Sequence, residues 1–511
     1  MMGSGKPTEG VYMDSNDWHK LQSGSDIRGE ADRLSDEFAE KIGYVFAQWV
    51  AKRTGTTSDK IKLAVGHDSR LSGPRLKDAL IRGMKAADND VLDCGLCTAP
   101  AVFMACVDPE TRAHGSIMIT ASHQPARRNG FKFCTRDGGL TGADVAELID
   151  AAARVEVPDP LVREIDYLTA YAENLAVMMR KRLNDMSKKP LLGLHVVVDA
   201  GNGAGGFYAR FLSDLGAEVE GSRCLDPDGS FPNHIPDPEN PEVMAQLSRA
   251  VLDTRADLGV IFDADCDRAA IVDQDGRAIN RNRLIALIAA ILLEENPGAT
   301  FVTDSVTSSG LNQFITEWGG THYRYKRGYR NVIDEAVRLN AEGIDCPLAI
   351  ETSGHAAFRE NHFLDDGVYL VSRLICEAMR LKREGLTLSS RIDELQEPVE
   401  SAEIRLPILD TEDYHLAAQE VIEAILSHTL ENPEWHLAPD NREGVRISFN
   451  LDGGVNNAWF QLRLSVHDPV MPLNAESDVP GGVRRMLAGL HALLGDIATL
   501  DLEPLRRAAG A

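Results

Sequence analysis

Short apolar runs alternate along much of the chain with longer stretches in which apolar residues recur every three or four positions. The short runs predict buried strands, and the longer stretches predict amphipathic helices. The predicted strands cover residues 61–66, 117–119, 195–198, 258–262, 301–303 and 348–350, and the helices cover residues 34–53, 75–86, 243–253, 284–295 and 329–338. This alternation predicts an α/β fold with helix-covered sheets.

The six strands form three successive pairs, which suggests three similar α/β units. After residue 398 the pattern changes to a hairpin around residues 452–454 and an amphipathic helix at 483–494, as in a small α+β domain. Breaks in the rhythm place the domains at residues 21–180, 190–296, 297–397 and 398–511, and residues 1–20 are predicted to be disordered.

Each strand is followed by a loop rich in Asp, Ser, Thr, Gly or His. In helix-covered parallel sheets, ligands bind beyond the carboxyl ends of the strands, which is where these loops lie. The strand at 117–119 runs into a turn of small residues that presents Ser122 and His123 and ends at Pro125. A serine fixed there by backbone suits a covalent carrier, although an ordinary strand exit explains the same residues when they are taken alone.

Three aspartates, Asp263, Asp265 and Asp267, follow the strand at 258–262. Carboxylates at alternate positions of an extended loop point to one side and can enclose a divalent cation. An EF-hand would need Gly at position 268 and Glu at position 274, where this chain has Arg and Gln. The pattern therefore favours an open Mg²⁺ site that also binds a phosphate oxygen; a solvated acidic turn is the alternative.

A rival motif lies at residues 201–206, where the sequence matches G-x-G-x-x-G between a predicted strand and a helix. Taken alone, it would indicate an NAD-dependent oxidoreductase. Tight strand-to-helix turns also use glycine for steric reasons, and we interpret the motif as structural.

Other loops offer further chemistry. Lys132 could shuttle a proton if its pKa is lowered, residues 351–355 could grip sugar hydroxyls, and residues 463–467 could clamp a phosphate. The ordinary alternatives are a solvated lysine, a satisfied loop and a surface ion pair. The pair Cys94 and Cys97 has C-x-x-C spacing, but without a second pair we interpret it as chance.

At 511 residues the chain is too long for one core, and its formal net charge is −25. This charge argues against nucleic acid or an anionic membrane as partner, but not against a small anionic substrate in a locally basic pocket. Scattered cysteines and the lack of a long apolar run or leader predict a cytoplasmic protein.

Together, these loops resemble four motifs of the α-D-phosphohexomutase family, specifically its phosphomannomutase/phosphoglucomutase branch. Residues 120–125 with 129–132 are similar to the phosphoserine loop T-A-S-H-N-P…N-G-x-K, and residues 263–268 to the metal loop D-G-D-x-D-R. Residues 351–355 are similar to the sugar loop G-E-x-S-G-H, and residues 463–469, more weakly, to the phosphate loop R-x-S-x-T-E-P.

The resemblance covers about residues 20–500 and is supported by residues 26–29, 66–70 and 326–328. It implies three similar α/β units with helix-covered mixed sheets and a C-terminal α+β domain, arranged around a central cleft. Gln124 and Ala264 replace the family's usual Asn and Gly. In the phosphate loop, Val466, His467 and Asp468 depart from the pattern, which affects the grip on phosphate and the choice of sugar.

The resemblance also assigns roles by position. Ser122 would carry a phosphoryl group and, with Asp263, Asp265 and Asp267, hold one Mg²⁺ per chain. Catalytic charge and proton transfer would come from Arg28, Lys132 and His355, and substrate would be bound by Arg268, Lys326, Gly328, Glu351, Ser353, His355, Arg463, Ser465 and His467.

The implied activity is that of an isomerase, an intramolecular phosphotransferase. It would interconvert hexose 1-phosphates and hexose 6-phosphates through a phosphoserine and a hexose 1,6-bisphosphate, which would also be an activator. The alternatives are a phosphoglucosamine mutase, the NAD-dependent oxidoreductase, and a non-catalytic sugar-phosphate-binding relative. Hexose phosphates are the expected partners of a monomer or homodimer, and the preference among mannose, glucose and glucosamine is left open.

Overall fold

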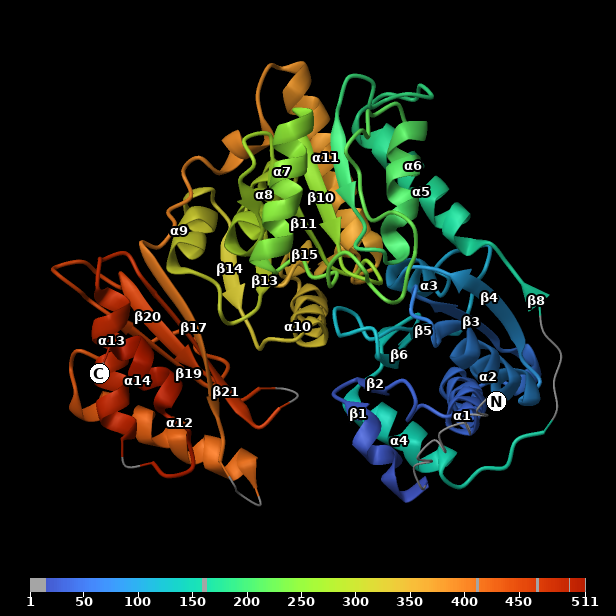
Figure 1. Cartoon of the computed structure of the whole chain (residues 1–511), viewed down its shortest axis with the longest axis horizontal. Coiled ribbons are helices and arrows are strands. Elements are labelled where there is room, and N and C mark those ends of the chain that lie inside the picture. The colour runs from blue at the N-terminus through green and yellow to red at the C-terminus, as the bar shows by residue number, and fades with distance from the viewer. Residues whose placement is uncertain (1–14, 159–162, 410–412, 466–467, 496, 511) are drawn as a thin grey trace, which may run out of the picture. The chain divides into compact units, whose positions relative to one another are not determined.

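A computed structural model describes residues 15–158, 163–409, 413–465, 468–495 and 497–510 (Figure 1). Contacts divide the chain into two compact units. The first runs to Ile279 and also includes residues 353–356 and 364–388, and the second contains residues 280–352, 357–363 and those from 389 onward. The first unit therefore recruits segments that lie far along the sequence.

The first unit begins with an eight-stranded mixed sheet in the order β1-β2-β6-β5-β3-β4-β8, with β7 beside β6. Its strands are β1 (Gln22–Ser23), β2 (Asp26–Glu30), β3 (Lys62–His67), β4 (Asp90–Leu96), β5 (Gly115–Ile119), β6 (Arg128–Thr135), β7 (Gly138–Gly139) and β8 (Arg163–Glu164). Strand β5 pairs in parallel with β3 and antiparallel with β6. Strands β3 and β6 therefore lie on either side of β5, the strand that leads into the loop carrying Ser122.

Helices pack on this sheet around a core of aliphatic and aromatic side chains. Those in this core are α1 (Asp36–Thr54), α2 (Gly73–Ala86) and α4 (Gly142–Ala152); α3 (Ala99–Met104) contacts β3 and β5, and α5 (Tyr167–Arg182) contacts α3. Helix α1 begins where the Ser35 side chain accepts a hydrogen bond from the Phe38 amide, and it ends at Gly55 in the left-handed conformation. These local signals explain why its bounds follow the sequence pattern closely.

A second sheet in the first unit runs in the order β12-β11-β10-β9, and only β9 and β10 pair in parallel. Its strands are β9 (Val196–Asp199), β10 (Leu258–Phe262), β11 (Ala269–Asp273) and β12 (Ala278–Ile279). The helices packed around it are α6 (Phe207–Asp214), α7 (Pro241–Thr254) and α11 (Gly367–Arg383). Helix α11 comes from the distant segment and contacts both β10 and β11.

The second unit starts with a sheet in the order β14-β13-β15-β16. Its strands are β13 (Thr300–Thr303), β14 (Thr321–Arg324), β15 (Leu348–Ile350) and β16 (Ala356–Phe358), and its helices are α8 (Arg281–Glu295), α9 (Ser309–Glu317) and α10 (Tyr329–Ala341). Strand β13 pairs in parallel with β14 and β15, as expected for strands joined by helices.

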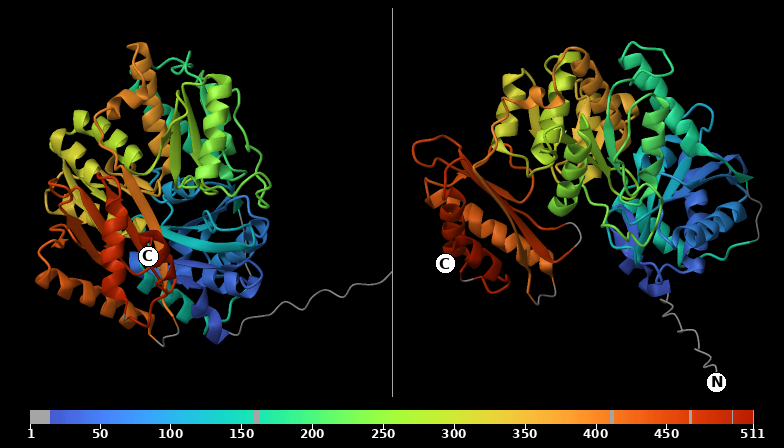
Figure 2. Two further views of the ribbon diagram at one scale, coloured as in Figure 1. Left: turned by 60° about the vertical axis from the view of Figure 1, so that its left-hand side comes forward. Right: turned by 45° about the horizontal axis from the view of Figure 1, so that its top comes forward.

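The C-terminal part is an antiparallel sheet with helices against one face (Figure 2). Its strands, in sheet order, are β17 (Glu400–Pro407), β21 (Val470–Ser477), β20 (Ala458–Leu462), β19 (Val445–Phe449) and β18 (His436–Leu437), and its helices are α12 (Tyr414–Glu431), α13 (Gly482–Leu494) and α14 (Glu503–Ala509). Alternate residues of β19, such as Val445 and Ile447, join the helix-facing core. Short 3-10 helices complete the chain at 15–21, 58–60, 204–206, 359–361 and 388–392.

The predicted fold class is confirmed: three α/β units with mixed sheets precede a C-terminal domain of sheet and helices. The predicted disorder of residues 1–20 is wrong for the last residues of that range. Residues 15–20 were expected to be disordered with the rest of 1–20, but residues 15–21 form a 3-10 helix and Trp18 is buried. The apolar ring is stabilised against Phe38 of α1, a contact that polar neighbours in the sequence do not reveal.

The glycines of the 201–206 motif serve close packing. A Cβ atom on Gly203 would lie 2.6 Å from the carbonyl oxygen of Ala264, and one on Gly206 would lie 1.8 Å from that of Leu225. Only glycine allows these backbone approaches, and the one at Gly203 brings the loop after β9 against the loop at 263–268. Packing therefore accounts for the motif that would otherwise indicate a dinucleotide site.

Helices α1 and α2 cross at two glycines, Gly43 and Gly83. A Cβ on Gly83 would lie 1.7 Å from the carbonyl oxygen of Glu40. We expect Gly83→Ala to lower the free energy of unfolding by about 1–3 kcal/mol, because the helices must separate. Urea denaturation measures this.

The matched control is Gly489→Ala on the exposed face of α13, where the added Cβ meets only a ring carbon of Trp435 at 3.4 Å. This change should stabilise by about 0.5–1 kcal/mol. Equal effects of the two substitutions would contradict the close crossing of α1 and α2.

Candidate active site

The loop after β5 holds Ser122 in a strained backbone conformation. Ser122 has φ of +54°, in the left-handed region, and its side chain is fully buried. Its backbone amide donates to Thr120 Oγ1 (2.9 Å), and the Thr120 hydroxyl donates to Asp68 Oδ2 (2.8 Å). A non-glycine residue keeps this conformation only where surrounding contacts enforce it.

Arg70 supplies those contacts. The side chain is fully buried, and its Nε donates to Asp68 Oδ2 (2.9 Å). The rest of the guanidinium donates to backbone carbonyl oxygens of the Ser122 loop, namely those of Ser122 (2.5 Å), Gln124 (2.8 Å), Pro125 (2.8 Å) and Arg128 (2.9 Å). The planar fork of donors of an arginine matches such a set of acceptors, so one side chain fixes the whole loop.

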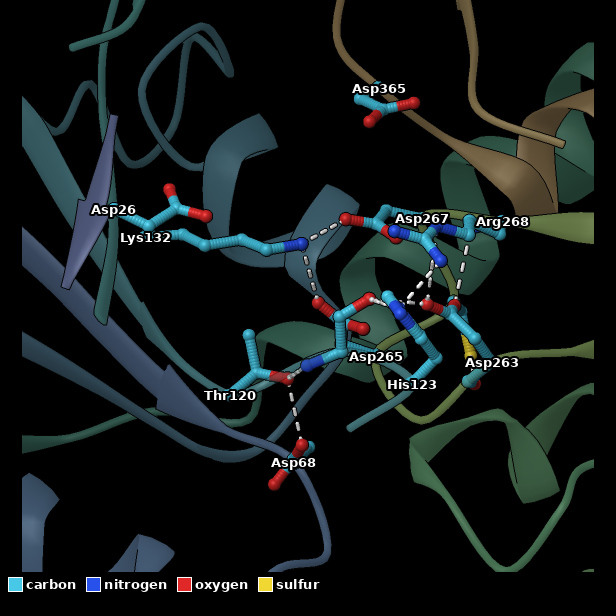
Figure 3. Close-up of polar contacts among 12 residues, drawn as sticks. Asp26, Asp68, Thr120, His123, Lys132, Asp263, Asp265, Asp267, Arg268 and Asp365 are labelled. Atoms are coloured by element: carbon cyan, nitrogen blue, oxygen red, sulfur yellow. Dashed lines mark hydrogen bonds and ion pairs between the residues drawn. The ribbon is translucent and has the colours of Figure 1, made fainter. Parts of the chain in front are cut away.

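The three aspartates after β10 gather in one cluster (Figure 3). The Ser122 hydroxyl donates to Asp263 Oδ2 (2.9 Å), and one carboxylate oxygen from each aspartate lies within 4.8 Å of the others. All three side chains are buried, and among the described residues Oδ1 of Asp265 and Oδ1 of Asp267 accept no hydrogen bond. Orphaned buried carboxylate oxygens at this spacing fit a divalent cation.

Lys132 reaches the same carboxylates from β6. Its ammonium group donates to Asp265 Oδ2 (3.0 Å) and also contacts Asp267 Oδ2. Burial acts to lower the pKa of Lys132, but Asp265 and Asp267 outweigh it, so the pKa is raised well above its ordinary value. The condition for a proton shuttle, a lowered lysine pKa, is not met in this arrangement; Lys132 is a cation here.

The carboxylates respond to their neighbours in opposite directions. Burial raises the pKa of Asp263 well above its ordinary value, and the charges of Asp267 and Asp265 add to the effect. Burial acts in the same direction on Asp267, yet Lys132, His355 and Arg268 hold its pKa below the ordinary value. The ionised form of Asp263 therefore needs additional positive charge close to it.

Arg268 lies between two imidazole rings. Its Nε donates to His355 Nε2 (2.7 Å), and its Nη1 lies 2.6 Å from His123 Nδ1. The charge of Arg268, followed by burial, lowers the pKa of His123 to about 2, so this ring is neutral. His123 Nδ1 is in turn 3.4 Å from Ser122 Oγ, which places the guanidinium next to the serine.

The loop at 263–268 is held in place by residues of the distant segment. The Ala269 amide donates to the Gly354 carbonyl (3.3 Å), and the Gly367 amide donates to the Cys266 carbonyl (3.1 Å). A Cβ on Gly354 would lie 2.5 Å from the Ala269 carbonyl oxygen. Glycine is thus required where the predicted sugar loop meets the predicted metal loop.

A second set of predicted residues lies in the second unit. Glu351 Oε1 accepts from the Gly328 amide (2.5 Å), and Glu443 Oε2 accepts from the adjacent Arg327 amide (3.1 Å) and from Ser305 Oγ (2.5 Å). Two glutamates from different domains therefore fix the loop before α10. Glu443 belongs to none of the motifs identified in the sequence.

Arg463 follows β20 and is buried, with its Nε 4.0 Å from Glu443 Oε2. Within the described chain, this Nε has no hydrogen-bond partner. Burial outweighs the attraction of Glu443 and lowers the pKa of Arg463, because its charge is incompletely compensated. Such a guanidinium is suited to an anionic ligand.

The structure thus places the predicted residues in two groups. The first unit contains Arg28, Ser122, Lys132, Asp263, Asp265, Asp267, Arg268, Ser353 and His355, and the second contains Lys326, Gly328, Glu351, Arg463 and Ser465. Arg28 pairs with Asp26 (2.8 Å) and its charge reaches both Lys132 and His123. Lys326 is exposed. His467 lies outside the described residues.

The pair Cys94 and Cys97 is buried and unbridged. Burial raises the pKa of Cys97 to about 12 and that of Cys94 well above its ordinary value. Both are protonated thiols, which agrees with the interpretation of their spacing as chance.

Comparisons with known proteins identify the family of the chain. Family models described as phosphoglucomutase/phosphomannomutase alpha/beta/alpha domains I, II and III match residues 19–157, 167–276 and 280–399. A phosphomannomutase/phosphoglucomutase of Pseudomonas syringae is 30% identical over 468 residues, covering 89% of this chain and 92% of that protein. A Salmonella typhimurium phosphomannomutase is 32% identical, covering 89% and 94%.

Among solved structures, a phosphoglucomutase/phosphomannomutase family protein of Burkholderia thailandensis aligns with a TM-score of 0.77 and 28% identity, covering 95% of this chain and 98% of that one. The fold and the serine–carboxylate cluster are those of a phosphoryl-transfer enzyme. The chain belongs to the phosphoglucomutase/phosphomannomutase branch of the α-D-phosphohexomutase family. The domain boundaries at 21–180, 190–296, 297–397 and 398–511 stay predictions.

We expect Arg70→Met to lower the free energy of unfolding by about 3–5 kcal/mol, because it leaves Asp68 as an uncompensated buried charge. It should also speed hydrogen exchange at the amides of residues 120–124, because their loop loses the contacts of Arg70. Urea denaturation and exchange mass spectrometry measure the two effects.

Arg127→Met is the matched control, since Arg127 only pairs with Glu30 at the surface (3.1 Å). It should change the free energy of unfolding by less than about 0.5 kcal/mol. Unchanged exchange in the Arg70 variant would contradict its assigned role in fixing the loop.

Proposed function

We propose that this chain is a phosphohexomutase that interconverts hexose 1-phosphates and hexose 6-phosphates through a phosphoryl group carried on Ser122. One observation carries the proposal: the Ser122 hydroxyl contacts Asp263, although 141 positions separate them in the chain. A hydroxyl and three carboxylates within one buried cluster supply both a covalent carrier and a site for charge neutralisation.

The metal of the proposal is Mg²⁺, held by Asp263, Asp265, Asp267 and the phosphorylated Ser122. Three carboxylates leave coordination positions for a phosphate oxygen, as Mg²⁺ requires. When bound, the cation would neutralise developing charge on the transferred phosphoryl group and offset the carboxylates that keep the pKa of Lys132 high.

The chain's own residues would act as follows. A sugar hydroxyl attacks the phosphorus in line, the bond from phosphorus to Ser122 Oγ breaks, and a hexose 1,6-bisphosphate forms. Arg268 neutralises charge beside Ser122 while the hydroxyl proton passes to Lys132, which needs the lowered pKa that a bound cation would give it. After the bisphosphate has turned over, its other phosphate returns to Ser122 and the bonds reverse.

Substrate binding is assigned to the second unit together with Ser353 and His355. Glu351 would hold sugar hydroxyls, and Arg463 with Ser465 would hold the phosphate that is not transferred. The incomplete charge compensation of Arg463 supports this role. Lys326, Gly328 and His467 keep their predicted substrate roles.

The curated relatives carry names for both mannose and glucose phosphates, so glucosamine phosphate remains the less favoured alternative. No helix in the described part of the chain is long and apolar enough to span a membrane. A cytoplasmic location, a monomeric or dimeric state, and activation by hexose 1,6-bisphosphate remain part of the proposal.

Ser122→Ala should abolish conversion of glucose 1-phosphate to glucose 6-phosphate, measured with catalytic glucose 1,6-bisphosphate present, because the carrier oxygen is lost. Ser248→Ala removes a hydroxyl that only donates to the Met244 carbonyl within α7, and it should leave turnover unchanged. Turnover by the Ser122 variant at the rate of the unmodified chain would overturn the proposal.

Asp265→Asn should weaken Mg²⁺ binding by more than about tenfold. Substitution of a residue that only orients a metal ligand already has an effect of about this size, and Asp265 would be a direct ligand. Isothermal titration calorimetry with MgCl₂ measures this without turnover. Asp275→Asn, in the exposed turn between β11 and β12, is the control and should bind Mg²⁺ normally. Equal affinity in both variants would argue against the proposed metal site.

A further inference from the structure

Asp365 is a buried carboxylate beside the reacting groups to which no motif assigns a role. It lies just before α11, at the Asp267 and Arg268 end of the cluster in Figure 3. Its Oδ1 accepts from the Ala356 amide (3.1 Å), and its Oδ2 lies against Nδ1 of His355. Asp365 therefore has one oxygen directed to the backbone and the other to an imidazole.

The opposite nitrogen of that imidazole shows where the ring carries its proton. His355 Nε2 accepts from Arg268 Nε (2.7 Å), and a guanidinium can only donate. Nε2 must therefore be unprotonated, and the ring carries its proton on Nδ1, facing the carboxylate of Asp365. Asp365, His355 and Arg268 therefore form one chain of contacts, called the relay below, in which His355 Nδ1 also lies 3.7 Å from Asp267 Oδ1.

The far end of the relay lies at the serine. Arg268 extends Nη1 to His123 Nδ1 (2.6 Å), and its backbone amide donates to Asp263 Oδ1 (3.2 Å). The guanidinium is thus oriented by a ring on each side and stays close to Ser122 Oγ. Turning the His355 ring, or moving its proton to Nε2, would put two N–H groups face to face and displace Arg268.

We propose that Asp365 is a positioning residue, which fixes the His355 tautomer and thereby holds the Arg268 guanidinium against the Ser122 centre. Its effect on rate rests on the proposed phosphoryl transfer, whereas the contacts among Asp365, His355 and Arg268 do not. If Asp365 were only structural, it would accept the hydrogen bond of the Ala356 amide, and the charge of Asp365 would have no effect on the His355 tautomer.

The substitution that separates these roles is Asp365→Asn. The asparagine oxygen can still accept from the Ala356 amide, but its NH₂ group then faces His355 Nδ1 as a donor. The ring must move its proton to Nε2, where it opposes the N–H of Arg268. We expect kcat for glucose 1-phosphate to fall about 10- to 100-fold, since a displacement near 1 Å has this effect, with KM within about twofold.

Nitrogen-15 NMR of the imidazoles tests the relay without turnover. The unmodified chain should show His355 protonated at Nδ1, and Asp365→Asn should show it protonated at Nε2. A double variant with Arg268→Lys should turn over no more slowly than Arg268→Lys alone, because both changes act through the same guanidinium.

Asp366→Asn is the matched control. Asp366 accepts from the Tyr171 hydroxyl (2.7 Å) and the Tyr369 amide (2.8 Å) through one oxygen, which asparagine retains. It should keep both kcat and the Nδ1 tautomer. The proposal is overturned by an unchanged tautomer in Asp365→Asn, or by an equal loss of kcat in both variants. If the unmodified chain shows no mutase activity, the proposed function fails, while the NMR comparison still decides the relay.

Discussion

The reacting centre depends on one buried guanidinium, that of Arg70, which binds a run of backbone carbonyls and so determines where Ser122 lies. A serine in the left-handed region costs of the order of 1–3 kcal/mol, and it keeps this conformation only because the loop has no better alternative. Rigidity of this kind suits a carrier of a phosphoryl group, since the oxygen that accepts the group must occupy the same position in both directions of the reaction.

Around this fixed point, the first unit concentrates more acidic groups than basic ones. Four buried carboxylates, from Asp263, Asp265, Asp267 and Asp365, face the two cations Lys132 and Arg268, while His123 accepts a hydrogen bond as a neutral ring. The second unit has the opposite imbalance at Arg463, whose charge is not fully matched. One set of groups attracts a cation and the other an anion, which is the pair of ligands that a metal-assisted transfer of phosphate needs.

Much of this could be predicted from the sequence, because strand-to-loop patterns are local. Ser122 and Asp263 belong to short motifs, and their side chains meet because both loops leave the same kind of strand end. Apart from Asp68, the partners of Arg70 are backbone carbonyl oxygens, which every residue type carries, so the sequence does not identify them. Glu443 acts through contacts with residues distant in sequence, and Asp365 through a loop that folds back on residues 355 and 356; a single sequence does not reveal such pairings. Whether Lys132 meets the condition of a lowered pKa depends on how many carboxylates reach it in space, which a single sequence does not reveal either.

The recruitment of residues 353–356 and 364–388 into the first unit has a consequence for biosynthesis. Strands β10 and β11 are translated well before α11, the helix that covers them, and the whole of residues 280–352 emerges in between. An N-terminal domain that leaves the ribosome in order would normally finish folding before the next one begins. Here the loop at 263–268 cannot accept the hydrogen bond of the Gly367 amide until that later stretch has been made. Until then, the nascent chain must protect the apolar face that α11 later covers.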